Sequence, residues 1–253
     1  GCLGITEATV ECNPEDTASG NFDFAALAAA GINRLSFGLQ AYSREERDFL
    51  GRRGTPAELT NSVRKAAAAG ITNFSVDLII GIPGQSERSL GESIAFCASA
   101  GARHVSAYLL KVEPGTPLYK NRACYALPDD DAVCDLYLFA CERLAKEGFA
   151  QYEISNFSRP GFESRHNLKY WRLADYLGLG PGAHSLLDGQ RFYYPRDLGH
   201  FIASGESCPD GRGGGFEEYL MLALRLSEGF DAAGAAGRYP GMAFDRLYCL
   251  CYP

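Results

Sequence analysis

The sequence predicts an α/β protein built around a parallel sheet, and three observations lead to this prediction. A short unit of alanine-rich helix, glycine and apolar strand recurs along the chain. Its strand segments are apolar runs interrupted by single polar residues, as in sheets covered on at least one face. The chain has 253 residues, enough for one large or two small domains, and its 46% hydrophobic and 22% charged content is typical of globular proteins.

The recurring unit places a glycine directly after an alanine-rich stretch. Its copies are 30–36 (AGINRLS), 69–75 (AGITNFS), 100–106 (AGARHVS) and, more loosely, 147–152 (EGFAQY). Glycine suits the left-handed position that ends a helix, and the residues after it favour a strand. We therefore expect helices near 22–30, 57–69, 86–100 and 130–147, and strands near 34–40, 73–80, 104–110 and 150–155. Alternation at this spacing is typical of βα units.

One face of the predicted sheet is small and polar. Because side chains alternate along a strand, Ser36, Gly38 and Gln40 share a face, and Ser75 and Asp77 do so in the next strand. Asp77 lies in an apolar run, where burial of an unpaired carboxylate is costly. This face indicates the inside of a barrel, or the crevice of an open sheet, that holds a polar ligand. A hydrogen-bonded structural carboxylate is the alternative for Asp77.

Polar side chains also gather where the predicted strands end. Glu11 closes the first apolar stretch, Gln40 closes the second, and the following loop carries Arg52. Asp77 leads into the glycine-rich segment 81–85 (GIPGQ). Ligands of parallel sheets bind at the carboxyl ends of the strands, so these four groups could come together in one ligand-binding site at that edge of the sheet. Taken singly, residues of these types are more often solvated or capping residues.

Charge and cysteine content narrow the classes of partner. The formal net charge of −7 argues against duplex nucleic acid or an anionic membrane as the main partner. No apolar run approaches the roughly 20 residues that span a bilayer. The nine cysteines form no CxxC pair and no plausible disulfide framework. We expect a cytoplasmic protein that binds a small ligand or another protein.

Five segments together resemble the radical S-adenosylmethionine proteins related to oxygen-independent coproporphyrinogen III oxidase. They are 10–14 (VECNP), 31–40 (GINRLSFGLQ), 50–52 (LGR), 77–85 (DLIIGIPGQ) and 151–157 (QYEISNF). Within that group, 164–171 (SRHNLKYW) and 178–185 (GLGPGAHS) resemble the HemW-type haem chaperones. The resemblance implies a partial (β/α) TIM-like barrel with a haem-signature segment over 1–204. The start of a small, mainly helical, winged-helix-like domain would follow over 205–253.

The resemblance also implies roles for particular residues. Glu11, Gln40, Arg52 and Asp77 match positions that hold the ribose and methionine parts of S-adenosylmethionine, and Ile79 and Lys111 match positions beside the adenine. A guanidinium suits a carboxylate, and carboxylate and amide oxygens suit ribose hydroxyls. The implied haem residues are His166, Asn167, Tyr170 and Trp171, with His166 as the candidate ligand of the haem iron.

The family's CxxxCxxC loop, which holds a [4Fe–4S] cluster, and its GGGTP stretch are absent from this sequence. We therefore expect the chain to lack an N-terminal part, and a C-terminal part as well. The resemblance implies a haem chaperone that delivers haem to respiratory haem proteins, as a possible homodimer. One alternative is an oxygen-independent coproporphyrinogen III oxidase. Another is an ordinary TIM-barrel lyase or aldolase that uses Asp77 and Lys111.

Overall fold

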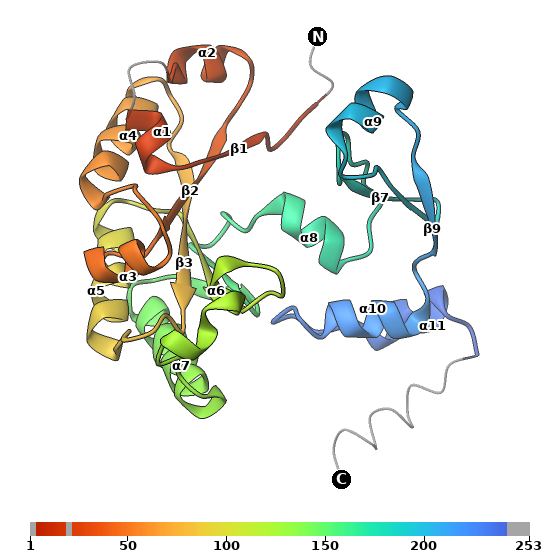
Figure 1. The fold of residues 1–253 in the computed structure, drawn as a ribbon. Helices are drawn as coiled ribbons and strands as arrows, with labels where there is room; N and C mark the ends of the chain where they lie inside the picture. Colours follow the sequence, from red (N-terminus) through yellow and green to blue (C-terminus); the bar gives the residue numbers. More distant parts are fainter. Residues whose placement is uncertain (1–3, 19–21, 242–253) are drawn as a thin grey trace. The chain divides into compact units, whose positions relative to one another are not determined.

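The computed structural model describes residues 4–18 and 22–241, and its internal contacts divide the chain into two compact units, Gly1–Glu163 and Ser164–Pro253. The first unit holds a six-stranded sheet and the second a three-stranded sheet (Figure 1). The division falls earlier than the boundary predicted at 204/205. Cys208–Arg212, which lies beyond the predicted boundary, forms a strand of the same sheet as the segments before it.

The sheet of the first unit begins with four parallel strands. These are β1 (Thr9–Cys12), β2 (Arg34–Gln40), β3 (Asn73–Ile80) and β4 (His104–Leu109). The predicted parallel core is confirmed. The single strand predicted at 150–155 is corrected to a hairpin of β5 (Ala150–Glu153) and β6 (Asn156–Ser158). β6 pairs antiparallel with β4, and its three residues are too few to show a hydrophobic period in the sequence.

The helices of the first unit alternate with the strands. They are α1 (Pro14–Ala18), α2 (Phe24–Ala29), α3 (Arg44–Phe49), α4 (Pro56–Ala68), α5 (Glu87–Ser99), α6 (Pro117–Lys120) and α7 (Asp130–Lys146), with a 3-10 turn at Arg122–Cys124. The glycines of the recurring unit follow α2, α4 and α5 with φ of 94° at Gly31, 92° at Gly70 and 85° at Gly101. Glycine adopts this left-handed backbone without a steric penalty, so each helix ends where the sequence predicts.

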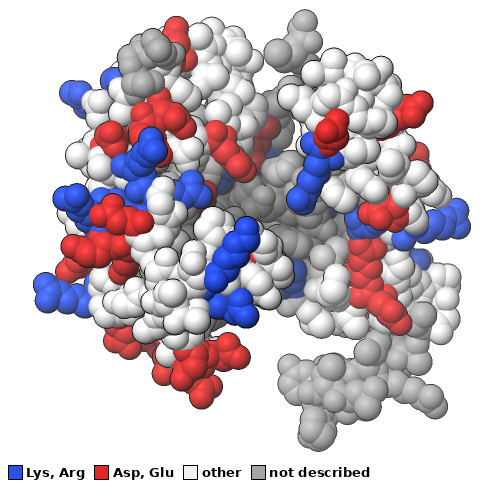
Figure 2. Space-filling model, in the orientation of Figure 1, with Lys and Arg blue, Asp and Glu red and all other residues white. Residues whose placement is uncertain are grey.

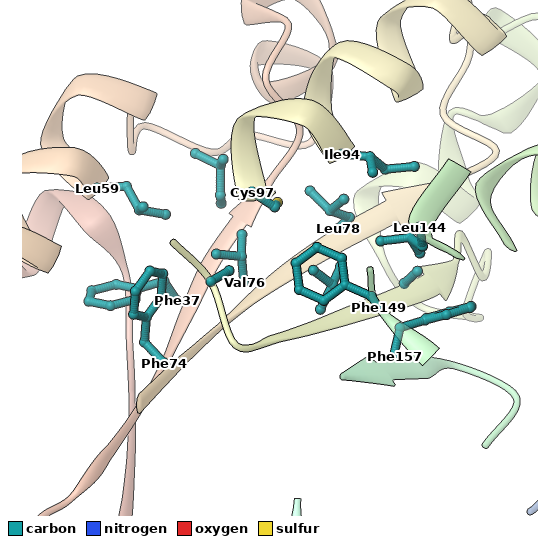
Figure 3. Close-up of a cluster of buried hydrophobic side chains, with 14 of the residues drawn as sticks. Phe37, Leu59, Phe74, Val76, Leu78, Ile94, Cys97, Leu144, Phe149 and Phe157 are labelled. Carbon is teal, nitrogen blue, oxygen red and sulfur yellow. The ribbon is translucent and has the colours of Figure 1, made fainter. Parts of the chain in front are cut away.

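The hydrophobic core lies between the helices and one face of the sheet. Phe37, Val76 and Leu78 point from the strands toward Leu59 of α4 and Ile94 of α5 (Figure 3). The opposite face carries serines instead, and Ser36 and Ser75 form a hydrogen bond 2.6 Å long between neighbouring strands. A sheet with helices on one face and small polar groups on the other is the wall of a partial barrel, as predicted.

The second unit combines short helices with an antiparallel sheet. Its elements are α8 (Arg165–Trp171), β7 (His184–Leu187), β8 (Gln190–Tyr193), α9 (Leu198–Ser204), β9 (Cys208–Arg212), α10 (Phe216–Ala223) and α11 (Ala232–Arg238). Asp188 and Gly189 connect β7 to β8 with positive φ at both positions, which is the backbone of a tight hairpin turn. None of the helices that the structure describes is long and apolar enough to cross a membrane.

Candidate functional site

A polar crevice opens at the carboxyl ends of the first three strands. Its volume is about 360 Å³. It is lined by Glu11, Cys12, Asn13, Ser36, Gly38, Gln40, Arg52 and Asp77. The structure thus brings together the four groups that the sequence placed at the strand ends. Because the strands are parallel and in register, β1, β2 and β3 deliver their last polar residues to one edge of the sheet.

Asp77 supplies a half-buried carboxylate at the base of the crevice. Burial, together with the nearby charge of Glu11, raises its pKa from 3.8 to about 6, against the lowering effect of hydrogen bonds from Ser106 and Ser36. The Ser36 Oγ donates to Asp77 Oδ1 over 3.3 Å. Asp77 is therefore held by serine hydroxyls from both neighbouring strands, and it retains an acceptor oxygen for a ligand hydroxyl.

Gln40 reaches the crevice through an irregularity in β2. The pairing of β2 with β3 shifts between Phe37 and Gln40, and Gln40 has a φ of 71°. A positive φ is uncommon for a residue other than glycine, so this backbone marks a site where strain is retained. A Cβ atom on Gly38 would lie 2.9 Å from Gln40 Nε2 and 3.2 Å from Asn13 Oδ1. The absence of a side chain at Gly38 thus leaves room for both amides.

Arg52 is positioned by the segment between β2 and α4. Its backbone nitrogen donates to the Arg47 carbonyl over 2.9 Å, and its Nη1 donates to Asn13 Oδ1 over 3.4 Å. Arg47 is itself buried, with Nη1 donating to the Ala41 carbonyl over 3.1 Å and to the Tyr42 carbonyl. These bonds fix the turn that carries Arg52, while its guanidinium retains donors for an anionic ligand group.

Gln85 fixes the loop that follows Asp77. Its Oε1 accepts a hydrogen bond from the Gly81 backbone over 2.8 Å, and its Nε2 donates to the Ile79 carbonyl over 3.0 Å. The same Nε2 donates to Glu46 of α3 over 3.1 Å. The segment 81–85 therefore ties the end of β3 to the helix that precedes Arg52.

Two of the six residues predicted to contact S-adenosylmethionine do not line the crevice. Ile79 follows Asp77 in β3, and Lys111 lies beyond β4 with an 81% exposed side chain, 2.7 Å from Glu113. Sequence reasoning did not single out Cys12 and Asn13, which do line it. The available signal was their place directly after Glu11, at the end of a predicted strand.

The second candidate site is α8 in the second unit. Ser164 caps this seven-residue helix, accepting a hydrogen bond from the Asn167 backbone. His166 and Tyr170 lie one turn apart and share a hydrogen bond of 2.9 Å between Nε2 and the phenol oxygen. His166 is exposed, while Tyr170 is half-buried. The helix therefore presents an imidazole and a phenol together.

The other predicted haem residues lie on the same helix. The Arg225 guanidinium stands over the Trp171 ring at 4.3 Å from its centroid. Asn167 and Trp171 are half-buried. Contact with Arg225 holds the indole in place.

The remaining histidines have other surroundings. His104 is 1% exposed and bonded to Tyr152 over 2.8 Å, and burial with the nearby Arg34 charge lowers its pKa to about 3. His184 stacks on Tyr193, and His200 lies on α9. Over residues 4–18 and 22–241, no three His, Cys, Asp or Glu side chains are grouped as a metal site would require.

Comparison with known proteins places these features in a family. A sequence profile described as "Radical SAM superfamily" matches residues 3–97, the part that carries the crevice. "Heme chaperone HemW" of Mycobacterium tuberculosis strain H37Rv is 38% identical over 92% of this chain. The chain is a HemW-like radical SAM protein. The HemW of Bacillus subtilis is 34% identical over 96% of the chain.

The chain covers 62% of the mycobacterial relative and 66% of the Bacillus relative. Coproporphyrinogen III oxidase (HemN) from Escherichia coli, a radical SAM enzyme, is a similar solved structure, with a TM-score of 0.75 and 18% identity. The alignment covers 96% of this chain and 60% of that one. At this identity the likeness shows a shared fold and no more, and it agrees with the predicted partial barrel.

Proposed function

We propose that this chain is part of a cytoplasmic haem chaperone that binds S-adenosylmethionine in the crevice and haem at α8, for delivery to respiratory haem proteins. The observation that carries the haem assignment is the exposed His166 imidazole beside an aromatic segment, in a chain 38% identical to a protein named heme chaperone HemW. Imidazole is a common axial ligand of haem iron, and aromatic rings pack on porphyrin faces. The cytoplasmic assignment is supported by the free thiols of the described cysteines.

The crevice fits the proposed adenosyl ligand in chemistry as well as in position. Arg52 would hold the methionyl carboxylate, while Gln40 and Asp77 would hold the ribose hydroxyls. The space above Gly38, which a Cβ atom would fill, leaves a cradle between Gln40 and Asn13. Together with a [4Fe–4S] cluster, S-adenosylmethionine supplies the radical chemistry for which the superfamily is named. This chain's own residues bind and orient the ligand.

Haem titration tests the proposal. We expect the wild-type protein to bind ferric haem with a Soret band that shifts or weakens in the His166→Ala variant, because the axial imidazole is lost. The matched control is His200→Ala, which removes another exposed imidazole from the same unit and should leave the spectrum unchanged. An identical Soret band in His166→Ala would contradict the proposed ligand.

The oxidase alternative predicts a different result with the same preparation. A protein that ignores haem but decarboxylates coproporphyrinogen III anaerobically, given S-adenosylmethionine and a reductant, is an oxidase and not a carrier. That outcome would overturn the chaperone proposal and leave the adenosyl crevice in place.

A further inference from the structure

The hydrogen bond between His166 and Tyr170 engages one of the two imidazole nitrogens that can bind a metal. The bond joins His166 Nε2 to the phenol oxygen over 2.9 Å, and the two rings meet edge to face with centroids 4.9 Å apart. Both residues belong to α8 and lie one helical turn apart, so the contact is local in the sequence. A neutral imidazole has one N–H and one lone pair, and iron binds the lone pair.

Tyr170 is suited to donate its proton to this nitrogen. A tyrosine phenol is protonated at physiological pH, so the Tyr170 hydroxyl can donate to the imidazole nitrogen 2.9 Å away. The Tyr176 ring packs against Tyr170 with centroids 4.5 Å apart at 69°, which holds the phenol in its orientation toward the helix. A phenol hydroxyl that stays protonated and is held in place donates well to a neutral imidazole.

We propose that Tyr170 acts as a gate on His166, occupying its Nε2 lone pair in the haem-free protein and leaving it when iron binds. This inference rests on the proposed haem site and adds to it a residue that sets how readily haem enters. In the exchange, the phenol-to-Nε2 hydrogen bond breaks and an Nε2-to-iron bond forms. The imidazole keeps its proton on Nδ1 throughout, so no proton transfer is needed.

A second tyrosine and histidine pair in the same unit provides the comparison. His184 and Tyr193 have rings stacked at 22° with centroids 5.3 Å apart, across paired strands β7 and β8. Within the described part of the chain, no hydrogen bond joins these two side chains. The two pairs therefore differ in the feature that the gate requires, a phenol on an imidazole nitrogen.

The first test uses the haem-free protein and nitrogen-15 NMR of its four histidine side chains. We expect the His166 signals of the wild type to show a proton on Nδ1 and an accepting Nε2, and this preference to be lost in Tyr170→Phe. Tyr193→Phe is the matched control and should leave the His184 signals unchanged, because no such bond exists there. An unchanged His166 tautomer in Tyr170→Phe would overturn the gate.

The second test is the titration of ferric haem into the same variants. Removal of the competing hydrogen bond should make haem binding to Tyr170→Phe about two- to tenfold tighter, mainly through faster association, with no change for Tyr193→Phe. Circular dichroism checks that both variants fold. Weaker binding with loss of a phenolate-to-iron absorption band would show that Tyr170 is itself a ligand and would overturn the gate.

The results for His166→Ala and Tyr170→Phe distinguish failure of the proposed haem site from failure of the gate. If His166→Ala binds haem as the wild type does, the proposed haem site is wrong and the gate with it. If His166→Ala loses haem but Tyr170→Phe and the wild type bind it equally, the haem site stands and only the gate is wrong.

Discussion

The crevice of the first unit and helix α8 of the second unit hold their polar groups in different ways. In the crevice, Glu11, Gln40 and Asp77 come from three neighbouring strands whose opposite face is packed against helices. On α8, His166 and Tyr170 come from one short helix and meet through a local contact. A site built across strands is fixed by the core behind it, whereas a pair on an exposed helix can separate without disturbing the fold.

Figure 2 shows Lys and Arg side chains interspersed with Asp and Glu on the visible face, without a single-sign field. Charge steering over that face is therefore a weak factor beside the local chemistry of each site. Experiments that compare the two regions should change individual side chains.

The largest effect is expected from Asp77, whose ionisation opposes folding of the first unit. Its folded pKa of about 6 lies above the ordinary value of 3.8, so the folded state binds the proton more tightly. Stability should therefore fall as the pH rises from about 4 to about 6, by up to about 3 kcal/mol, and stay lower above that range. Urea unfolding at several pH values, in the wild type and in Asp77→Asn, measures this.

The difference in pH-dependent stability between the wild type and Asp77→Asn reports the contribution of Asp77, because the other carboxylates are present in both proteins. Asp77→Asn should lack this part of the pH dependence, because the amide does not ionise. Equal pH slopes for the two proteins would show that the crevice carboxylate ionises as freely as an exposed one, and the contrast with α8 would lose its basis.

A smaller effect is expected from filling the cradle at Gly38. In Gly38→Ala the new Cβ atom would force the Gln40 amide to move, since it would lie 2.9 Å from Nε2. Loss of that contact should weaken S-adenosylmethionine binding by about 10- to 30-fold in calorimetric titration, while haem binding stays unchanged. Gly91→Ala is the matched control, because its Cβ would meet Phe139 at an ordinary 3.4 Å. Equal losses in both variants would point to general destabilisation.

The smallest effect is expected at the cap of α8. Ser164→Ala removes the side chain that accepts from the Asn167 backbone, which should cost the helix about 1 kcal/mol. Trp171, the only tryptophan of the chain, lies on this helix and reports its unfolding by fluorescence. S-adenosylmethionine binding should not change. A loss of adenosyl affinity in this variant would show that the two sites are coupled.

The order and kind of the main elements could be predicted from local sequence signals. Gly31, Gly70 and Gly101 mark helix ends because only glycine adopts their backbone freely, and that preference is visible in the sequence. The β5–β6 hairpin and the position of β9 could not be predicted in this way. Both are short strands whose pairing partners, β4 and β8, lie far from them in sequence or beyond a helix.

The sequence by itself determined that polar residues such as Glu11 and Asp77 stand at strand ends in apolar surroundings, because alternation and burial are properties of the local chain. Only the tertiary structure decided which of them share a crevice. The shifted pairing that turns Gln40 inward and the Asn13 amide on Arg52 depend on contacts between distant segments. The hydrogen bond between Tyr170 and His166 depends on both the local sequence and the tertiary structure. Helical spacing brings the two side chains within reach, and packing of Tyr176 orients the phenol.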